Sequence, residues 1–123
     1  MTPVDEPVVA YRSGSEHYTD EGCFIVELLG VGHDARLSVA RARVEPGGIT
    51  RLHRLVGVEE RYVILSGEGV VEVGEHTARR VGPMDVVRIP PGIGQRIRNI
   101  GREDLVFLCL CTPPFVQACY EEV

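Results

Sequence analysis

From residue 23 onward the chain consists of short runs in which hydrophobic and polar residues alternate, with glycine or proline between runs. Alternation with a period of two is typical of β-strands that bury one face, and glycine and proline favour the turns between them. We expect strands over residues 23–29, 36–44, 70–73, 76–81, 85–89, 95–100 and 105–111, and a further strand pair between Pro46 and Gly67. No window of 11 residues has helical spacing. The pattern predicts an all-β sandwich or barrel.

The first 22 residues differ from the rest because they are mostly polar and lack a hydrophobic period. We expect residues 1–22 to form an arm with one short strand, and residues 23–123 to form the barrel. Arms of this kind often pack on a partner subunit, which favours a homodimer.

The length of 123 residues fits one domain with its own hydrophobic core. No apolar run approaches the roughly 18 residues of a membrane span, and the start of the chain lacks the basic leader of a signal peptide. We therefore expect a cytoplasmic protein that does not bind membranes.

All 13 positively charged side chains are arginines, and the formal net charge is -5. The absence of lysine excludes Schiff-base chemistry and a lysine general base. A net negative charge argues against binding to a nucleic-acid backbone. One arginine can still hold a small carboxylate or phosphate, because the guanidinium matches the geometry of both groups.

The four cysteines stand at positions 23, 109, 111 and 119 and have no C-x-x-C spacing. We expect them to be buried, reduced thiols rather than a metal or redox centre.

His53 and Glu60 are the candidate catalytic residues. They follow the turn formed by Pro46, Gly47 and Gly48, and they lie seven positions apart in a predicted strand pair. An imidazole and a carboxylate brought together in this way can bind a metal ion or act as an acid/base pair.

These residues belong to a longer pattern. Gly47, His53, Glu60 and Gly67 match the first motif of the cupin family, G(X)5HXH(X)3-4E(X)6G, and Pro90, Gly92 and Asn99 match its second motif, G(X)5PXG(X)2H(X)3N. The chain therefore resembles a small single-domain cupin. The resemblance implies a double-stranded β-helix, a jelly-roll-like barrel that holds a small molecule, and it also implies a homodimer.

Three positions depart from the cupin motifs. Leu55 and Gln95 replace two of the family's histidine ligands, and Met84 replaces the opening glycine of the second motif. One hypothesis is that His53, Glu60 and the Gln95 carbonyl bind a divalent metal ion. The alternative is a hydrogen-bonded polar cluster without metal. We favour the metal-free form, because losing two imidazoles removes much of the affinity for a transition metal.

Strand alternation adds residues to the expected pocket, because side chains two positions apart share a face. The pocket residues expected in this way are Arg51, Leu55, Tyr62, Gln95, Ile97 and Asn99. Arg51 would be the one arginine inside the cavity. It would either hold an anionic ligand or form a buried ion pair with Glu60.

Two functions from different classes follow from the resemblance. The first is an isomerase, cyclase or lyase that moves a proton on a small polar or anionic metabolite, with His53 and Glu60 as base and acid or as metal ligands. A dioxygenase is disfavoured, because iron in cupins depends on the histidines that are missing here. The second is a non-catalytic protein that binds a sugar-like molecule or a carboxylate.

Overall fold

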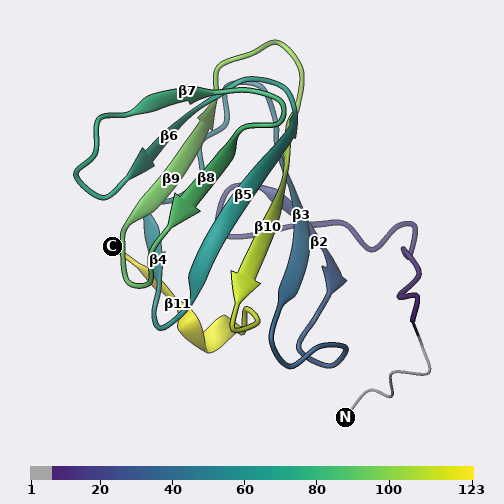
Figure 1. Cartoon of the computed structure of the whole chain (residues 1–123). Coiled ribbons are helices and arrows are strands. Elements are labelled where there is room, and N and C mark those ends of the chain that lie inside the picture. The colour runs from purple at the N-terminus through teal and green to yellow at the C-terminus, as the bar shows by residue number, and fades with distance from the viewer. Residues whose placement is uncertain (1–6) are drawn as a thin grey trace.

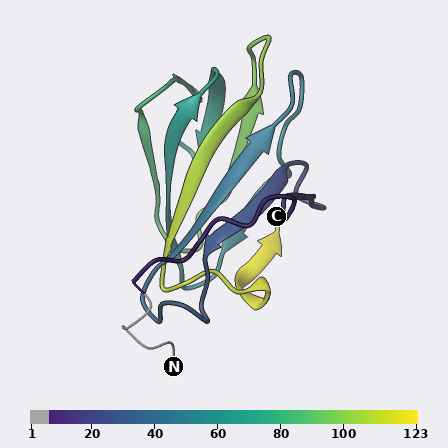
Figure 2. The same cartoon turned by 90° about the vertical axis from the view of Figure 1, so that its right-hand side faces the viewer.

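The computed structural model describes residues 7–123, which form two β-sheets packed face to face (Figure 1, Figure 2). The six-stranded sheet has the order β1 (His17–Tyr18), β2 (Phe24–Leu29), β3 (Ser38–Val44), β10 (Leu105–Thr112), β5 (Glu59–Ser66) and β8 (Val86–Ile89). The five-stranded sheet has the order β11 (Tyr120–Glu122), β4 (His53–Leu55), β9 (Gln95–Asn99), β6 (Gly69–Val73) and β7 (Arg79–Val81).

The predicted all-β barrel is confirmed, but the strand pair expected between Pro46 and Gly67 is wrong, because β4 and β5 lie in different sheets. The strand pairings within each sheet are antiparallel, and the described residues contain no α-helix, only the short 3-10 helix η1 (Gln117–Cys119). The expected strand over 76–81 begins only at Arg79, because a turn in which the His76 N–H donates to the Val73 carbonyl comes first. Within residues 7–123 no helix has the length and hydrophobicity needed to span a bilayer.

The hydrophobic core fills the space between the two sheets. Its most deeply buried members include Ile64, Ile97, Leu105 and Phe107, each at most 2 % exposed. Tyr62 packs on Phe107 with the ring centroids 4.6 Å apart. Burying a large apolar side chain contributes about 1.5–3 kcal/mol, so this layer supplies most of the energy that holds the sheets together.

The inward faces of β5 and β9 follow the predicted alternation. Glu60, Tyr62 and Ile64 are buried from β5, and Gln95 and Ile97 are buried from β9. The barrel interior is therefore apolar at its centre and polar where Glu60 and Gln95 enter it.

Asn99 also faces inward, but it has a structural role. Its Nδ2 donates to the carbonyls of Val44 and Glu103 at 2.8 Å, and its Oδ1 accepts from the Gly101 N–H. These bonds fix the turn after β9, so the expectation that Asn99 belongs to the pocket is wrong.

The described part of the arm packs on its own chain. β1 pairs with β2, the Tyr18 ring packs on Phe24 with the centroids 4.9 Å apart, and Glu16 forms an ion pair with Arg43 at 2.8 Å. The domain division at residue 22 and the homodimer stay predictions. Residues 1–6 of the predicted arm lie outside the described residues.

The cysteines are unpaired, as expected. Cys23, Cys111 and Cys119 are buried, and Cys109 is partly buried. All four are free thiols.

Met84 adopts a backbone conformation that suits glycine. Its φ is 74°, and it lies in a turn closed by the Asp85 N–H donating to the Gly82 carbonyl at 3.0 Å. Pro83 before it and a positive φ at the third position are the features of a type II turn. The methionine side chain is 79 % exposed, so it gains little from packing.

We predict that Met84→Gly stabilises the protein by about 0.5–1 kcal/mol. A left-handed backbone costs a non-glycine residue about 1–2 kcal/mol, whereas glycine raises the entropy of the unfolded chain by only about 0.4–1 kcal/mol. Urea unfolding of both proteins measures the difference. Met84→Ala is the matched control and should show no gain, since alanine keeps the strain. Equal or lower stability of the glycine variant would contradict the prediction.

Candidate functional site

A cavity of about 220 Å³ lies inside the barrel, between the inner faces of β2 and β3 on one side and β4 on the other. Phe115 and Gln117 of the segment after β10 also line it. The lining residues are His17, Thr19, Glu21, Ile25, Glu27, Ser38, Val39, Ala40, His53, Leu55, Glu60, Cys109, Cys111, Phe115 and Gln117. Three candidates named from the sequence, His53, Leu55 and Glu60, therefore meet in one cavity.

His53 is held in a defined orientation by two contacts. Its Nδ1 lies 2.7 Å from the Arg51 carbonyl, and its ring stacks on Tyr120 with the centroids 4.9 Å apart. A carbonyl can only accept, so Nδ1 carries the hydrogen and Nε2 of the neutral ring keeps its lone pair. Burial lowers the pKa of His53, although the bond to Arg51 acts in the opposite direction. The side chain is therefore a neutral hydrogen-bond acceptor near pH 7.

Glu60 ends a chain of buried hydrogen bonds. The Tyr62 hydroxyl donates to Gln95 Oε1, Gln95 Nε2 donates to Glu60 Oε1 at 2.9 Å, and the Cys111 thiol donates to Glu60 Oε2 at 3.7 Å. Burial raises the pKa of Glu60 to about 7, although the bond from Gln95 favours the ionised form. Desolvation outweighs that bond. Both protonation states of Glu60 are therefore populated at neutral pH.

Glu21 is a cavity residue that the sequence analysis missed. It is half-buried, burial raises its pKa, and within residues 7–123 its carboxylate has no hydrogen-bond partner. Its position is fixed through the backbone, because the Arg51 N–H donates to the Glu21 carbonyl at 2.8 Å. No local motif marks this residue, which lies in the polar arm.

Arg51 lies outside the cavity, and both roles expected for it there are wrong. Its side chain is 60 % exposed and pairs with Glu122 at 3.6 Å. β4 begins at His53, so the alternation that places Leu55 inside does not extend back to Arg51. The cavity lining therefore contains no arginine.

Three other expected pocket residues lie behind the cavity wall. Tyr62 and Ile97 belong to the hydrophobic core, and Gln95 is fully buried behind Glu60. They support the site without lining it.

The donor set does not fit a metal ion. Gln95 turns its amide nitrogen toward Glu60 and its oxygen toward Tyr62, so the oxygen that would bind a cation points away from the carboxylate. Turning the amide around would place its oxygen against the ionised carboxylate of Glu60, and both of these groups are acceptors. Within residues 7–123 no group of three or more His, Cys, Asp or Glu side chains is arranged to hold a metal ion.

The comparison with known families agrees with the fold. The family model described as Cupin domain matches residues 40–111. This chain is a member of the cupin family. The matched range contains both cupin motifs, including the positions of His53, Leu55, Glu60 and Gln95.

Relatives of this cupin share most of its length. The protein MJ1618 of Methanocaldococcus jannaschii is 35 % identical over 107 residues, which are 85 % of each chain. The structure of a predicted oxalate decarboxylase from Thermotoga maritima is 26 % identical, with a TM-score of 0.76, and the match covers 86 % of this cupin and 98 % of that chain.

A larger enzyme contains the same fold. The Lactobacillus farciminis oxalate decarboxylase, solved as a formate complex, is 24 % identical with a TM-score of 0.75. The match covers 88 % of this cupin but only 33 % of that chain, so the cupin spans about one third of the enzyme. At this identity the likeness shows the fold alone.

The buried Glu60 makes the stability of this cupin depend on pH. Below pH 4.5 the carboxyl is protonated in the folded and the unfolded chain. Between pH 4.5 and about 7 the unfolded chain loses this proton while the folded chain keeps it, so the free energy of unfolding falls as pH rises. Above about pH 7 this contribution is constant, and its total size is about 3 kcal/mol.

We predict that Glu60→Gln removes most of this fall, because an amide does not titrate. Urea unfolding at pH 5, 6, 7 and 8 measures the effect, and the slope with pH, rather than the absolute stability, is the readout. Glu45→Gln, at an exposed position, is the control and should keep the wild-type slope. An unchanged slope in Glu60→Gln would show that Glu60 is not the titrating group.

Proposed function

We propose that the cavity binds a small neutral polar molecule, such as a sugar-like metabolite, and that Glu60 transfers a proton to or from it. The observation that supports this is the placement of two functional groups in one cavity. The Glu60 carboxyl is held there by Gln95, and His53 lines the same cavity with an imidazole that is neutral. The proposed reaction class is isomerisation, cyclisation or a lyase reaction.

The size of the cavity limits the ligand. A volume of about 220 Å³ is about seven times the ~30 Å³ share of one water molecule in the liquid. It is below the roughly 300–1,000 Å³ typical of pockets for drug-sized ligands. A single small ring or a short chain is therefore the expected ligand.

The charge of the lining favours a neutral ligand over an anion. Glu21, Glu27 and Glu60 contribute carboxyl groups, and no arginine faces them. Each ionised carboxylate would repel a second negative charge. The Thermotoga maritima relative is a predicted oxalate decarboxylase. A dicarboxylate such as oxalate would meet repulsion from the carboxyl groups of this lining.

The roles of the side chains follow from their hydrogen bonds. Gln95 donates to Glu60 Oε1. Glu60 Oε2 accepts from the Cys111 thiol, which is a weak donor, so Oε2 is the atom that exchanges a proton. The ionised form accepts the proton and the protonated form returns it, and a pKa of about 7 suits both steps. His53 Nε2 accepts a hydrogen bond from a ligand hydroxyl and orients it.

Deuterium exchange tests the proposal. Wild-type protein, purified without an affinity tag, is incubated in D₂O with a panel of neutral aldoses, ketoses and inositols, and proton NMR follows the loss of C–H signals. We expect exchange or conversion of at least one compound, and Glu60→Gln should lower its rate by about 100-fold or more, the usual contribution of a general acid/base. Glu45→Gln should retain the wild-type rate.

Two results would contradict the proposal. Turnover that survives in Glu60→Gln would remove the proton-transfer role, and turnover that depends on bound metal, measured by elemental analysis of the same preparation, would require a different arrangement of donors. Binding of a panel compound without exchange would favour the non-catalytic alternative, a pocket that only holds its ligand.

A further inference from the structure

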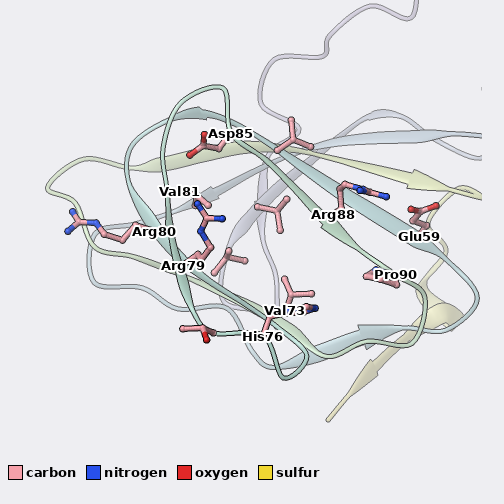
Figure 3. A pocket seen from close by; sticks show the side chains of 13 residues that line it. Glu59, Val73, His76, Arg79, Arg80, Val81, Asp85, Arg88 and Pro90 are labelled. Carbon is pink, nitrogen blue, oxygen red and sulfur yellow. The ribbon is translucent and has the colours of Figure 1, made fainter.

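A second hollow opens on the other side of the barrel (Figure 3). It has a volume of about 580 Å³ and lies where β7, the edge of the five-stranded sheet, meets β8, the edge of the six-stranded sheet. None of its lining residues belongs to the cavity that contains His53 and Glu60. We call this hollow the β7–β8 groove.

The floor of the β7–β8 groove is apolar. It is formed by Val71, Val73, Val81 and Val87, which belong to the hydrophobic core or pack against it. Val73 and Val81 are labelled in Figure 3 among the side chains that line the groove. The two edge strands do not pair with each other, so the groove reaches the core between them.

The side chain of Arg79 lies on the face of β7 that is directed toward the valines of the floor. It is the cross-strand partner of Val71, and directly opposed residues of an antiparallel pair share a face of the sheet. Val71 is 6 % exposed and faces the core, so Arg79 projects from the inner face. Within residues 7–123 its guanidinium has no hydrogen bond or ion pair. The side chain is exposed, so this free guanidinium is accessible to a ligand that lies on the valines.

Arg80, the next residue, gives an internal contrast. It also lines the groove, but it is opposite Val70 on the outer face of β7 and forms a 3.8 Å ion pair with Glu68. In Figure 3 it extends away from Val73 and Val81. The two arginines thus lie in the same strand but project from opposite faces of it.

Arg88 adds a second uncompensated charge at the opposite rim. It is exposed and, in the described part of the chain, has no ion-pair partner. It alternates with the buried Val87 and Ile89, so its side chain leaves the outer face of β8 at the rim of the groove. The acidic residues of the rim are already engaged, because Glu59 pairs with Arg61 at 2.7 Å and Asp85 accepts from the Gly82 N–H at 2.8 Å. In a chain of net charge -5, the groove therefore combines an apolar floor with two unpaired guanidinium groups.

We propose that the β7–β8 groove binds small amphipathic carboxylates, with the aliphatic or aromatic body on the valines and the carboxylate on Arg79. The guanidinium matches a carboxylate in shape and charge, and Arg88 attracts the same head group from the other rim. Glu59 and Asp85 keep negative charge close by, which disfavours a dianion such as a phosphate monoester. The site is independent of the proton-transfer function proposed for Glu60.

Octanoate is the probe for this proposal. Titration into the ¹⁵N-labelled full-length protein, followed by amide chemical shifts, gives both the location and the affinity. We expect shifts to concentrate at Val71, Arg79, Val81 and Val87, with weaker binding of n-octanol, which lacks the charge, and of acetate, which lacks the body. Arg79→Gln should weaken octanoate roughly three- to ten-fold, the loss of one charge-assisted hydrogen bond at a partly exposed site.

The matched control is Arg98→Gln, which should change the affinity less than about two-fold, because Arg98 is an exposed arginine of the same sheet that does not line the groove. Glu60→Gln should leave octanoate binding unchanged, which separates this site from the cavity. The proposal is overturned if octanol binds as tightly as octanoate, if Arg79→Gln and Arg98→Gln weaken binding equally, if the shifts occur at His53 and Leu55 instead, or if no shifts appear at millimolar octanoate.

Discussion

The buried carboxyl of Glu60 is the constraint on which the interior of this barrel depends. An ionisable group placed in an apolar core must be neutralised or given hydrogen bonds, since its desolvation is costly. The structure provides bonds from Gln95 and Cys111, and burial still raises the pKa to about 7. The same chain of bonds also satisfies the hydroxyl of Tyr62, which would otherwise be left buried without a partner.

The two-sheet architecture determines where ligands can enter. A sandwich buries the faces of its sheets but leaves two lateral openings, where the edge strands of one sheet meet those of the other. In this cupin the cavity with Glu60 lies toward one opening, beside β2 and β4, and the β7–β8 groove occupies the other. The first opening carries carboxyl groups and the second carries unpaired guanidinium groups, so the ligands that we propose for the two openings differ in charge.

The sequence predicted the fold and the strand faces well, but it predicted the cavity only in part. Alternation placed Glu60 and Gln95 inside because both lie within paired strands. It failed for Arg51, because the alternation applies only inside a strand and β4 begins at His53. Glu21 was missed because it reaches the cavity through a backbone bond to a residue 30 positions away in the chain. A contact between residues so far apart in the chain leaves no local pattern in the sequence.

The two substitutions at the ligand positions of the motif act together on Glu60. Gln95 Nε2 donates to the carboxylate of Glu60, and Gln95 Oε1 accepts from the Tyr62 hydroxyl. One neutral amide can make both bonds at the same time. Leu55 packs with Val58, Cys111 and Cys119 in a second apolar cluster, which includes the thiol that contacts Glu60. The hydrogen bond from the Gln95 amide favours the ionised form of Glu60, whereas burial raises the pKa of Glu60. The balance of the two effects keeps Glu60 able both to accept and to donate a proton at neutral pH.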